Sequence, residues 1–507
     1  MANIKDNRIY IDMTPAKVFV PTPTHEAIFE DVKFGRSATI TARAGGGKSS
    51  SLAESTKYLD QRNQRILMTT FATEASGDLK GKVSEHVKVK TLHAIGWRIL
   101  KSHDPQIETD RSRGVKNIAK FTPNGEPGDR YAVASIVSYA KNTLASSRQN
   151  LDDIYGILAP SPPTYSRSTV IDIAEQVLEF AKKPNGFMDF DDMIWLPNVW
   201  GLQGAPWDVV FIDEAQDINL AQVGILNKSV QPNVTAIYAV ADPAQAIYSW
   251  RGALPQAMEA LKLNFSINRS HLLPISYRCD TAIIQYAQQI VPDIQARPNA
   301  LPGIVRQVYT LQATRPRDFV ISRANRDLFQ AQRVLRRAGK LCTILGDRFQ
   351  KVLEDLLRKS KADSVPKLIQ WLDTYWSVER GAIQKKYPEP CNTRARLVED
   401  LDDRVGSLRE LATGCLSISA VQGAIYQAFS APGPDHVLLM TVHKAKGLEA
   451  DSVWLIGDSF AWFRRQYQRQ YAHEVADGMD VEDDNLAYVA ITRARHELNI
   501  VTGTRKI

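Results

Sequence analysis

Short apolar runs that end in polar or glycine-rich residues organise the first half of the chain. They lie in SATITARAGGGKSSS, QRILMTTFATEA, PWDVVFIDEAQD and VTAIYAVADPAQAIYSW. Strands that are buried on both faces of a parallel sheet have this continuous apolar character, and ligands bind where such strands end. The pattern therefore predicts a parallel α/β sheet whose strand ends carry the chemistry.

The interval between the first and third of these runs is longer than a compact α/β domain needs. Helical patterns such as DRYAVASIVSYAKNTLASS and STVIDIAEQVLEFAKK fill it, and they flank a proline-rich break, APSPPTYS. We therefore expect a helical insert at residues 97–185, within a first α/β domain formed by residues 1–96 and 186–277.

A second set of apolar runs begins at RDFVISRANRDLF and resumes at DHVLLMTVHKAKGLEADSVWLIG. The stretch between them has mostly helical patterns, including FQKVLEDLLRKSKADSVPKLIQWLDTYW. This order predicts a second α/β domain at residues 278–327 and 434–507, with a reduced helical insert at residues 328–433.

The composition is that of an ordinary globular protein with a basic balance. Hydrophobic residues make up 44% of the chain and charged residues 23%, and the formal net charge is +7. A positive excess fits a polyanionic partner such as nucleic acid, but it fits a basic enzyme equally well.

The four cysteines, Cys279, Cys342, Cys391 and Cys415, are scattered along the chain. No two have the spacing of a metal knuckle or a redox pair, so reduced thiols are expected rather than a zinc or iron–sulfur site. No window approaches about 18 uninterrupted apolar residues, and the N-terminal segment has no secretory apolar region. A cytoplasmic protein without a membrane segment is the expectation.

The glycine-rich loop after the first run has the residues of a phosphate cradle. Gly45, Gly46 and Gly47 can adopt positive φ and let backbone N–H groups approach phosphate oxygens. Lys48 would neutralise the β- and γ-phosphates, and the hydroxyl of Ser49 would reach Mg²⁺ at the start of the following helix. A glycine-rich turn without a ligand is the alternative, and the order of strand, loop, G-K-S and helix makes it the weaker one.

The run FIDEAQD delivers two carboxylates to the end of a strand. Hydrolysis of a nucleoside triphosphate needs one carboxylate near Mg²⁺ and one that orients and deprotonates the attacking water. Asp213 suits the first role and Glu214 the second. Such a pair alone is often a solvated strand end, but together with the glycine loop it favours catalysis.

Arginines in SYR and AYVAITRAR could clamp phosphate charge from a second domain, which is how arginine fingers act. They are Arg278, which follows Tyr277, and the pair Arg493 and Arg495. From the residues alone, surface positions are the better interpretation, because surface arginines are common.

These motifs together resemble those of superfamily 1 DNA helicases of the UvrD/Rep/PcrA group. In chain order the resemblance is carried by PTPTHEAIF, ARAGGGKSS, ILMTTFATEA, TLHAI, MDFDDMI, FIDEAQD, VADPAQAIYSWRGA, SYR, VLLMTVHKAKGLEA and LAYVAITRAR. It implies an α/β fold of two RecA-like P-loop domains, with parallel sheets flanked by helices and mainly helical inserted subdomains. It also implies an ATP- and Mg²⁺-dependent translocase and DNA helicase with 3′→5′ polarity, acting on single-stranded DNA and at junctions with duplex.

The resemblance further implies roles for individual residues in the ATP site. Gln245 would sense the γ-phosphate, Tyr277 would stack on adenine, and Glu449 would contact the ribose side. The implied catalytic residues are Lys48, Asp213, Glu214, Gln245, Arg278 and Arg493, with Ser49 and Asp213 at the metal. The implied nucleotide-binding residues are His25, Ala44, Gly45, Gly46, Gly47, Lys48, Ser49, Ser50, Tyr277 and Glu449.

The residues that match the family's DNA-contacting positions are mostly aromatic. Every base has a π-face, so aromatic side chains grip a single strand without reading its sequence. The matching residues are Phe71, Thr91, His93, Phe190, Tyr248, Trp250 and His443.

The chain departs from the family pattern in several places. His25 stands where a glutamine normally reads adenine, and an imidazole cannot donate and accept through one amide-like edge, so strict ATP selectivity is left open. Thr73 and Glu74 replace a polar–basic pair after Phe71. The segment AWFRRQYQRQYAHE could contact DNA or equally form a solvated helix face. The compact size of the chain and its divergent motifs favour a phage or mobile-element origin.

Two other functions compete with a helicase. One is a nucleic-acid-stimulated NTPase subunit of a nuclease, recombination or defence complex, which the short second insert favours. The other is a DNA-binding module with a decayed P-loop, which the intact catalytic residues disfavour. No nuclease constellation is visible, so no cleavage of DNA is expected.

Overall fold

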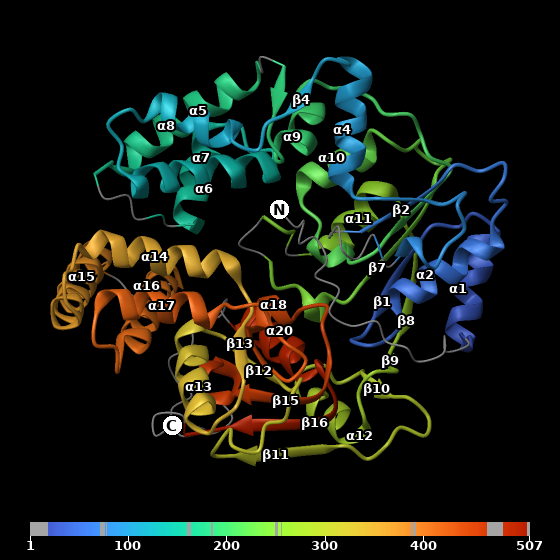
Figure 1. Ribbon diagram of the computed structural model, residues 1–507. Helices are drawn as coiled ribbons and strands as arrows, with labels where there is room; N and C mark the ends of the chain where they lie inside the picture. The colour runs from blue at the N-terminus through green and yellow to red at the C-terminus, as the bar shows by residue number, and fades with distance from the viewer. Residues whose placement is uncertain are drawn as a thin grey trace, which may run out of the picture.

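Two six-stranded parallel sheets, each flanked by helices, form the two halves of the molecule (Figure 1). They are described by a computed structural model, which covers residues 19–70, 77, 79–158, 160, 164–183, 186–248, 252–254, 256–386, 388, 392–463 and 480–503. The predicted fold class, α/β with two parallel sheets, is confirmed. The predicted domain boundaries remain predictions.

The first sheet has the strand order β3-β2-β6-β7-β1-β8. Its strands are β1 (Ala38–Ala42), β2 (Ile66–Thr69), β3 (Lys88–Lys90), β6 (Val209–Ile212), β7 (Ala236–Ala241) and β8 (Arg269–Leu273). The central strands β6 and β7 are buried throughout, because both faces of the sheet are covered and their side chains are apolar apart from the Tyr238 hydroxyl, which donates to the Asp31 carbonyl. The expected phosphate-binding and catalytic residues of this half follow β1, β6 and β7.

Helices and short turns cover the first sheet and follow its strands. They are α1 (Pro23–Lys33), α2 (Lys48–Ser55), α4 (Leu92–His103), α9 (Asp192–Val199), α10 (Leu220–Asn227) and α11 (Ala257–Phe265), with the 3₁₀ turns η1 (Thr56–Tyr58), η2 (Ala215–Asp217) and η3 (Pro243–Gln245). Two apolar clusters, one around Val210 and Ile237 and one around Ile40 and Phe211, pack these helices on the sheet.

A helical group is inserted between β3 and β6, as its sequence pattern predicts. It contains α5 (Arg113–Phe121), α6 (Pro127–Thr143), α7 (Arg148–Leu158) and α8 (Arg167–Ala181), and the short parallel pair β4 (Glu108–Thr109) and β5 (Phe187–Met188). The group has its own apolar core, centred on Ile136, Ile154 and Val177. Figure 1 shows it at the top, in teal and green.

The second sheet has the strand order β11-β16-β15-β12-β14-β13. Its strands are β11 (Ile304–Val308), β12 (Phe319–Ser322), β13 (Cys342–Ile344), β14 (Val437–Thr441), β15 (Ala450–Ile456) and β16 (Ala494–Val501). Its helices are α12 (Thr281–Ala287), α13 (Asn325–Arg337), α18 (Val442–Ala445) and α20 (Asp480–Ile491), with the turn η5 (Gly457–Ser459). The pair β9 (Ile275–Ser276) and β10 (Gln295–Ala296) lies between the two sheets in Figure 1.

In the described part of the chain, four helices lie between β13 and β14: α14 (Asp347–Ser360), α15 (Val365–Lys386), α16 (Asn392–Ala412) and α17 (Ile418–Ala428). The range 328–433, predicted to be mostly helical, also includes β13, which pairs with β14 in the second sheet. Three apolar residues are too few for a periodic signal, and long-range pairing makes them a strand. Helix α16 contacts α7, so the two inserted groups meet.

Among the described residues, no helix has both the length and the apolar character to cross a membrane.

A buried charge network fixes the first inserted group to the helix that follows it. The Lys141 ammonium lies 2.7 Å from Asp192 and 3.0 Å from Asp189, and Arg113 also pairs with Asp192. Arg113, Lys141 and Asp192 are almost inaccessible to water. An unpaired buried carboxylate or ammonium is costly, so this pairing holds α5, α6 and α9 in their arrangement.

We expect Lys141→Met to lower the free energy of unfolding by about 3–5 kcal/mol, because it removes the cation that Asp189 and Asp192 share and leaves Asp192 with Arg113 alone. Urea unfolding followed by tryptophan fluorescence measures this, with Trp195 beside Lys141 as a local reporter. The control is Lys116→Met, which removes an exposed pair with Asp110 and should cost at most about 1 kcal/mol. Equal losses in the two variants would contradict the interpretation.

Candidate active site

The glycine loop between β1 and α2 is shaped by close approaches that exclude side chains. A Cβ on Gly45 would lie 2.6 Å from Ser276 Oγ and 2.7 Å from Arg278 Cβ. Gly45 and Gly47 also have φ values of 72° and 73°, which favour glycine. The carbonyl of Gly45 accepts the backbone N–H of Tyr277 at 2.9 Å, so the loop is tied to the segment that leads into the second half.

The two carboxylates after β6 face the first residues of α2. The Lys48 ammonium lies 2.8 Å from Glu214, and the hydroxyl of Ser49 donates to Asp213. Glu214 has φ of 54°, a left-handed turn that ends the strand and separates the two side chains. The motifs assign these four residues to one nucleotide site, and the structure brings them together.

The protonation of these groups follows from burial and from their neighbours. Burial and the Glu214 charge raise the pKa of Asp213. Burial alone would raise the pKa of Glu214, but Lys48 and Lys446 outweigh it and lower that pKa. Burial likewise disfavours a charged Lys48, and the neighbouring carboxylates, Glu214 foremost, reverse the effect and raise its pKa. Glu214 is therefore an ionised carboxylate at neutral pH.

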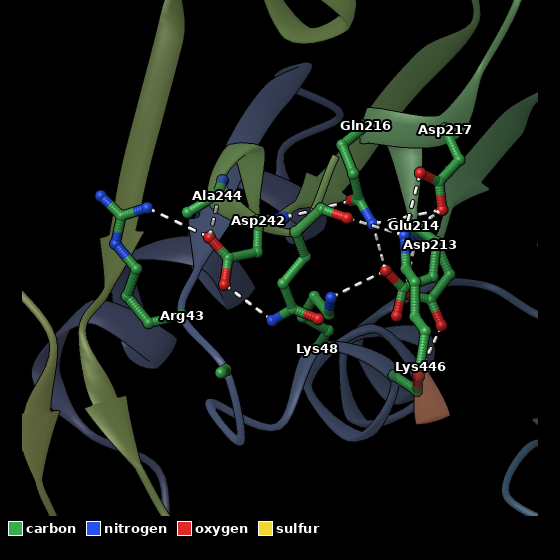
Figure 2. Close-up of polar contacts among 12 residues, drawn as sticks. Arg43, Lys48, Asp213, Glu214, Gln216, Asp217, Asp242, Ala244 and Lys446 are labelled. Carbon is green, nitrogen blue, oxygen red and sulfur yellow. Dashed lines mark hydrogen bonds and ion pairs between the residues drawn. The ribbon is translucent and has the colours of Figure 1, made fainter. Parts of the chain in front are cut away.

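Asp242, at the end of β7, is a buried acceptor on which several loops converge. It accepts from Gln245 Nε2 at 2.7 Å, from Arg43 Nη1 at 3.1 Å and from the Tyr488 hydroxyl at 3.1 Å. Its backbone N–H donates to Gln216 Oε1 at 3.2 Å. Figure 2 shows these contacts running from Arg43 through Asp242 to Gln216. Gln245, the residue expected at the γ-phosphate, is thereby held at the glycine loop.

Tyr488 joins the two halves at this point. Its hydroxyl also accepts the backbone N–H of Ala44 at 3.0 Å, and its side chain is fully buried. Ala44 and Ile247 from the first half pack in the same apolar cluster as α20. The sequence reasoning missed Asp242 and Tyr488, although both lie in the quoted motifs; a carboxylate directly after an apolar run was the available signal for Asp242.

The two arginines of the second half have different surroundings. Arg493 is 1% exposed, and within the described chain its hydrogen-bond acceptors are the carbonyls of Val489 and Leu448 and the hydroxyl of Thr492. Burial, with Arg278 nearby, lowers the pKa of Arg493 to about 9. It is a buried cation bonded to neutral oxygens, which suits it to meet an added anion.

Arg278 and Glu449 form an ion pair. Arg278 also donates to the carbonyl of Thr492 at 3.0 Å, and Glu449 accepts from Arg495 Nε at 3.0 Å. Glu449, expected on the ribose side, thus lies between two arginines. Thr492 lies between the end of α20 and Arg493, and it accepts hydrogen bonds from both arginines. The structure thus brings Arg278 and Arg493 to the same loop.

Lys446 makes a second polar contact between the halves. Its ammonium lies 2.6 Å and 2.9 Å from the two oxygens of Asp217 and 2.8 Å from the carbonyl of Gln245. The same ammonium lies 4.7 Å from the ring centroid of Tyr248. Burial raises the pKa of Asp217 to about 6, although Lys446 opposes this. Lys446 was missed by the sequence reasoning, despite its place in HKAKGLE.

The expected DNA-contacting residues form two groups. His93 and Phe190 stack with ring centroids 4.0 Å apart, and Phe190 is 59% exposed. Thr91 caps α4, which carries His93. Tyr248 donates to the carbonyl of His443 at 3.4 Å, at the junction of the halves.

Phe71 and Trp250 lie outside the described residues, as do Thr73, Glu74 and most of AWFRRQYQRQYAHE.

The remaining expected nucleotide contacts surround the glycine loop. Ser50 lies in the first turn of α2, and Tyr277 is 41% exposed. His25 is buried in α1, and both of its ring nitrogens have partners within the chain, Thr22 and Ser51.

Two protein-family models match the chain. The model described as the UvrD/REP helicase N-terminal domain matches residues 24–266, and that of the UvrD-like helicase C-terminal domain matches residues 317–505. Together they cover the glycine loop, the acidic strand end and the motif of Arg493.

Individual relatives are similar at low identity. The "ATP-dependent DNA helicase Rep" of Buchnera aphidicola (subsp. Baizongia pistaciae) is 27% identical over 50% of this chain and 40% of its own length. The "F-box DNA helicase protein 1" of Schizosaccharomyces pombe is 23% identical over 92% of this chain and 55% of its own. The "ATP-dependent DNA helicase PcrA" of Bacillus subtilis is 25% identical over 50% and 37%. The chain thus matches about half the length of these relatives, or less.

Tyr488→Phe removes the hydroxyl that accepts from the Ala44 N–H and donates to Asp242. We expect it to lower the free energy of unfolding by about 1–3 kcal/mol, because both buried groups lose a hydrogen bond. Thermal unfolding measured by calorimetry tests it. Tyr131→Phe removes the hydroxyl of a tyrosine that is 73% exposed and serves as the matched control. If both variants melt at the wild-type temperature, the hydroxyl does not join the halves.

Proposed function

Because the chain belongs to the UvrD-like helicase family, we propose that it is an ATP-dependent translocase on single-stranded DNA and a DNA helicase. The observation that carries the proposal is the 2.8 Å ion pair of Lys48 and Glu214 at a glycine loop, with the buried Arg493 on the facing half. A phosphate-binding loop with two acids on one half, and arginines on the other half, are the parts that phosphoryl transfer needs.

Each charged group has a distinct part in hydrolysis. Lys48 leaves Glu214 and binds the β- and γ-phosphates, which frees the ionised carboxylate to orient the attacking water and take its proton. Arg278 and Arg493 stabilise the charge that develops on the γ-phosphoryl oxygens. Gln245, held by Asp242, orients the γ-phosphate side of the site.

Ser49 and Asp213 fit Mg²⁺. Their hydroxyl and carboxylate oxygens already meet, and Mg²⁺ is commonly held by one or two carboxylates together with substrate phosphates. The described residues contain no group of three or more His, Cys, Asp or Glu that could hold a metal by itself, which agrees with a site completed by nucleotide. When bound, Mg²⁺ would neutralise charge on the β- and γ-phosphates.

Lys446 is the residue through which hydrolysis would be coupled to the DNA strand. It contacts the loop of Gln245 on one side and the ring of Tyr248 on the other. A displacement of the second half would therefore move both the γ-phosphate side and an aromatic DNA contact. Strand movement in the 3′→5′ direction is the polarity that the family resemblance favours.

The stacked pair of His93 and Phe190 is proposed as one of the places where single-stranded DNA binds. Burial lowers the pKa of His93 to about 4, so the ring is neutral and presents a π-face rather than a charge. The exposed ring of Phe190 extends that face.

Glu214→Gln is expected to reduce DNA-stimulated ATP hydrolysis by about 10²–10⁴-fold, since it removes the base and keeps the shape. Phosphate release with and without oligo-dT measures the rate, and displacement of a labelled strand measures unwinding. Lys48→Ala should lose both activities. Lys57→Ala, at an exposed pair with Glu54, is the control and should keep both. Wild-type turnover in the Glu214 variant would overturn the mechanism.

Phe190→Ala is expected to weaken binding of oligo-dT by about 1–3 kcal/mol, because one stacking platform is lost. Fluorescence anisotropy at fixed salt measures the affinity. Phe34→Ala removes an exposed ring at the end of α1, far from the pair in sequence, and should leave the affinity unchanged. If the two variants bind oligo-dT with the same affinity, Phe190 does not contact the DNA strand.

The alternative is an NTPase subunit of a nuclease, recombination or defence complex that does not unwind efficiently alone. The small second insert, formed by α14 to α17, favours it. In the assays above, this alternative predicts DNA-stimulated hydrolysis by the wild-type protein without strand displacement.

A further inference from the structure

His25 is held between α1 and the glycine loop by hydrogen bonds whose directions can be assigned. The backbone N–H of Thr22 lies 3.1 Å from Nδ1 of His25. A backbone N–H can only donate, so Nδ1 is the unprotonated nitrogen and Nε2 carries the proton. Nε2 lies 3.0 Å from Ser51 Oγ, and that hydroxyl donates to the carbonyl of Gly47 over 2.9 Å. These hydrogen bonds form one donor chain, which runs from Thr22 through His25 and Ser51 to the carbonyl of Gly47 in the glycine loop.

The environment of the ring keeps this chain intact. The imidazole is 3% exposed, with the ring of Phe19 edge-on at 5.0 Å and that of Phe29 at 6.1 Å. Burial lowers the pKa of His25, so the ring is neutral near pH 7. A neutral ring has one donor and one acceptor, and both are used within the protein.

The chain ends on the peptide that shapes the phosphate cradle. The carbonyl of Gly47 accepts both the N–H and the hydroxyl of Ser51, at 2.8 Å and 2.9 Å. This carbonyl and the N–H of Lys48 belong to one planar peptide unit. Fixing the carbonyl therefore fixes the direction of a backbone N–H at the place where phosphate oxygens are expected.

We propose that His25 is a positioning residue of the phosphate cradle and not a reader of the base, so that the site accepts ribonucleoside triphosphates with little discrimination among bases. The inference rests on the proposed NTPase function. Of the other residues expected at the nucleoside end, Glu449 is paired with two arginines. Tyr277 offers a partly exposed ring, whose face stacks on any base.

Turnover of the four common nucleoside triphosphates tests the proposal directly. With oligo-dT present, kcat/KM of the wild-type protein for ATP, GTP, CTP and UTP should agree within about tenfold. A site that hydrogen-bonds a group of its substrate rejects analogues lacking it by about 10⁴-fold or more. A preference for ATP above about 100-fold would overturn the proposal.

Two variants separate positioning from base reading. His25→Ala and Ser51→Ala interrupt the same donor chain at different links. Each should raise KM by a similar factor, about tenfold at most, for all four nucleotides, with a smaller effect on kcat. The control is Glu26→Gln, an exposed neighbour of His25 on α1, which should leave KM unchanged. A rise in KM confined to ATP would show that His25 reads adenine.

Binding without DNA distinguishes failure of this inference from failure of the proposed function. A fluorescent ATP analogue bound to the wild-type protein is displaced by each unlabelled nucleotide in turn. Displacement by all four at similar concentrations supports the proposal even if no nucleotide is hydrolysed, in which case the NTPase function fails alone. Displacement by ATP but not by the others overturns it.

Discussion

The buried carboxylate of Asp242 is the constraint on which the arrangement of the site depends. It is fully shielded from water, so its oxygens must be satisfied by donors of the protein. Arg43, Gln245 and Tyr488 supply them from the end of β1, the turn η3 and helix α20. One buried carboxylate therefore sets the positions of the glycine loop, the turn that carries Gln245 and the second half relative to one another.

The charges around this centre are distributed unevenly between the halves. On the first half, Lys48 pairs with Glu214, and Lys446 reaches across from the second half to Asp217. On the second half, Arg493 is buried among neutral oxygens. Under the proposed function, the phosphates of a nucleotide provide the missing anion, which draws the halves together and releases Glu214 from Lys48. Binding and closure then have the same electrostatic cause.

The strongest predictions from sequence concerned elements with a local signal. The apolar runs became β1, β6 and β7, and Lys48, Ser49, Asp213 and Glu214 meet as the order of strand and loop indicates. Strand β13 was not anticipated, because its three residues have no periodicity of their own. Asp242, Tyr488 and Lys446 stand in motifs that were recognised, but nothing in their neighbours along the chain shows which partners they have.

The kinds of chemistry and the order of elements can be deduced from the amino-acid sequence, since apolar periodicity, glycine loops and acid pairs act over a few residues. Which groups contact each other depends on how distant segments pack. Lys446 and Asp217 are 229 positions apart, and His25 and Ser51 are 26 apart. Burial keeps His25 neutral, and hydrogen bonds to Thr22 and Ser51 occupy both of its ring nitrogens. Both effects depend on residues from separate elements. A residue type at a motif position therefore does not reveal whether it faces the ligand or braces the loop that does.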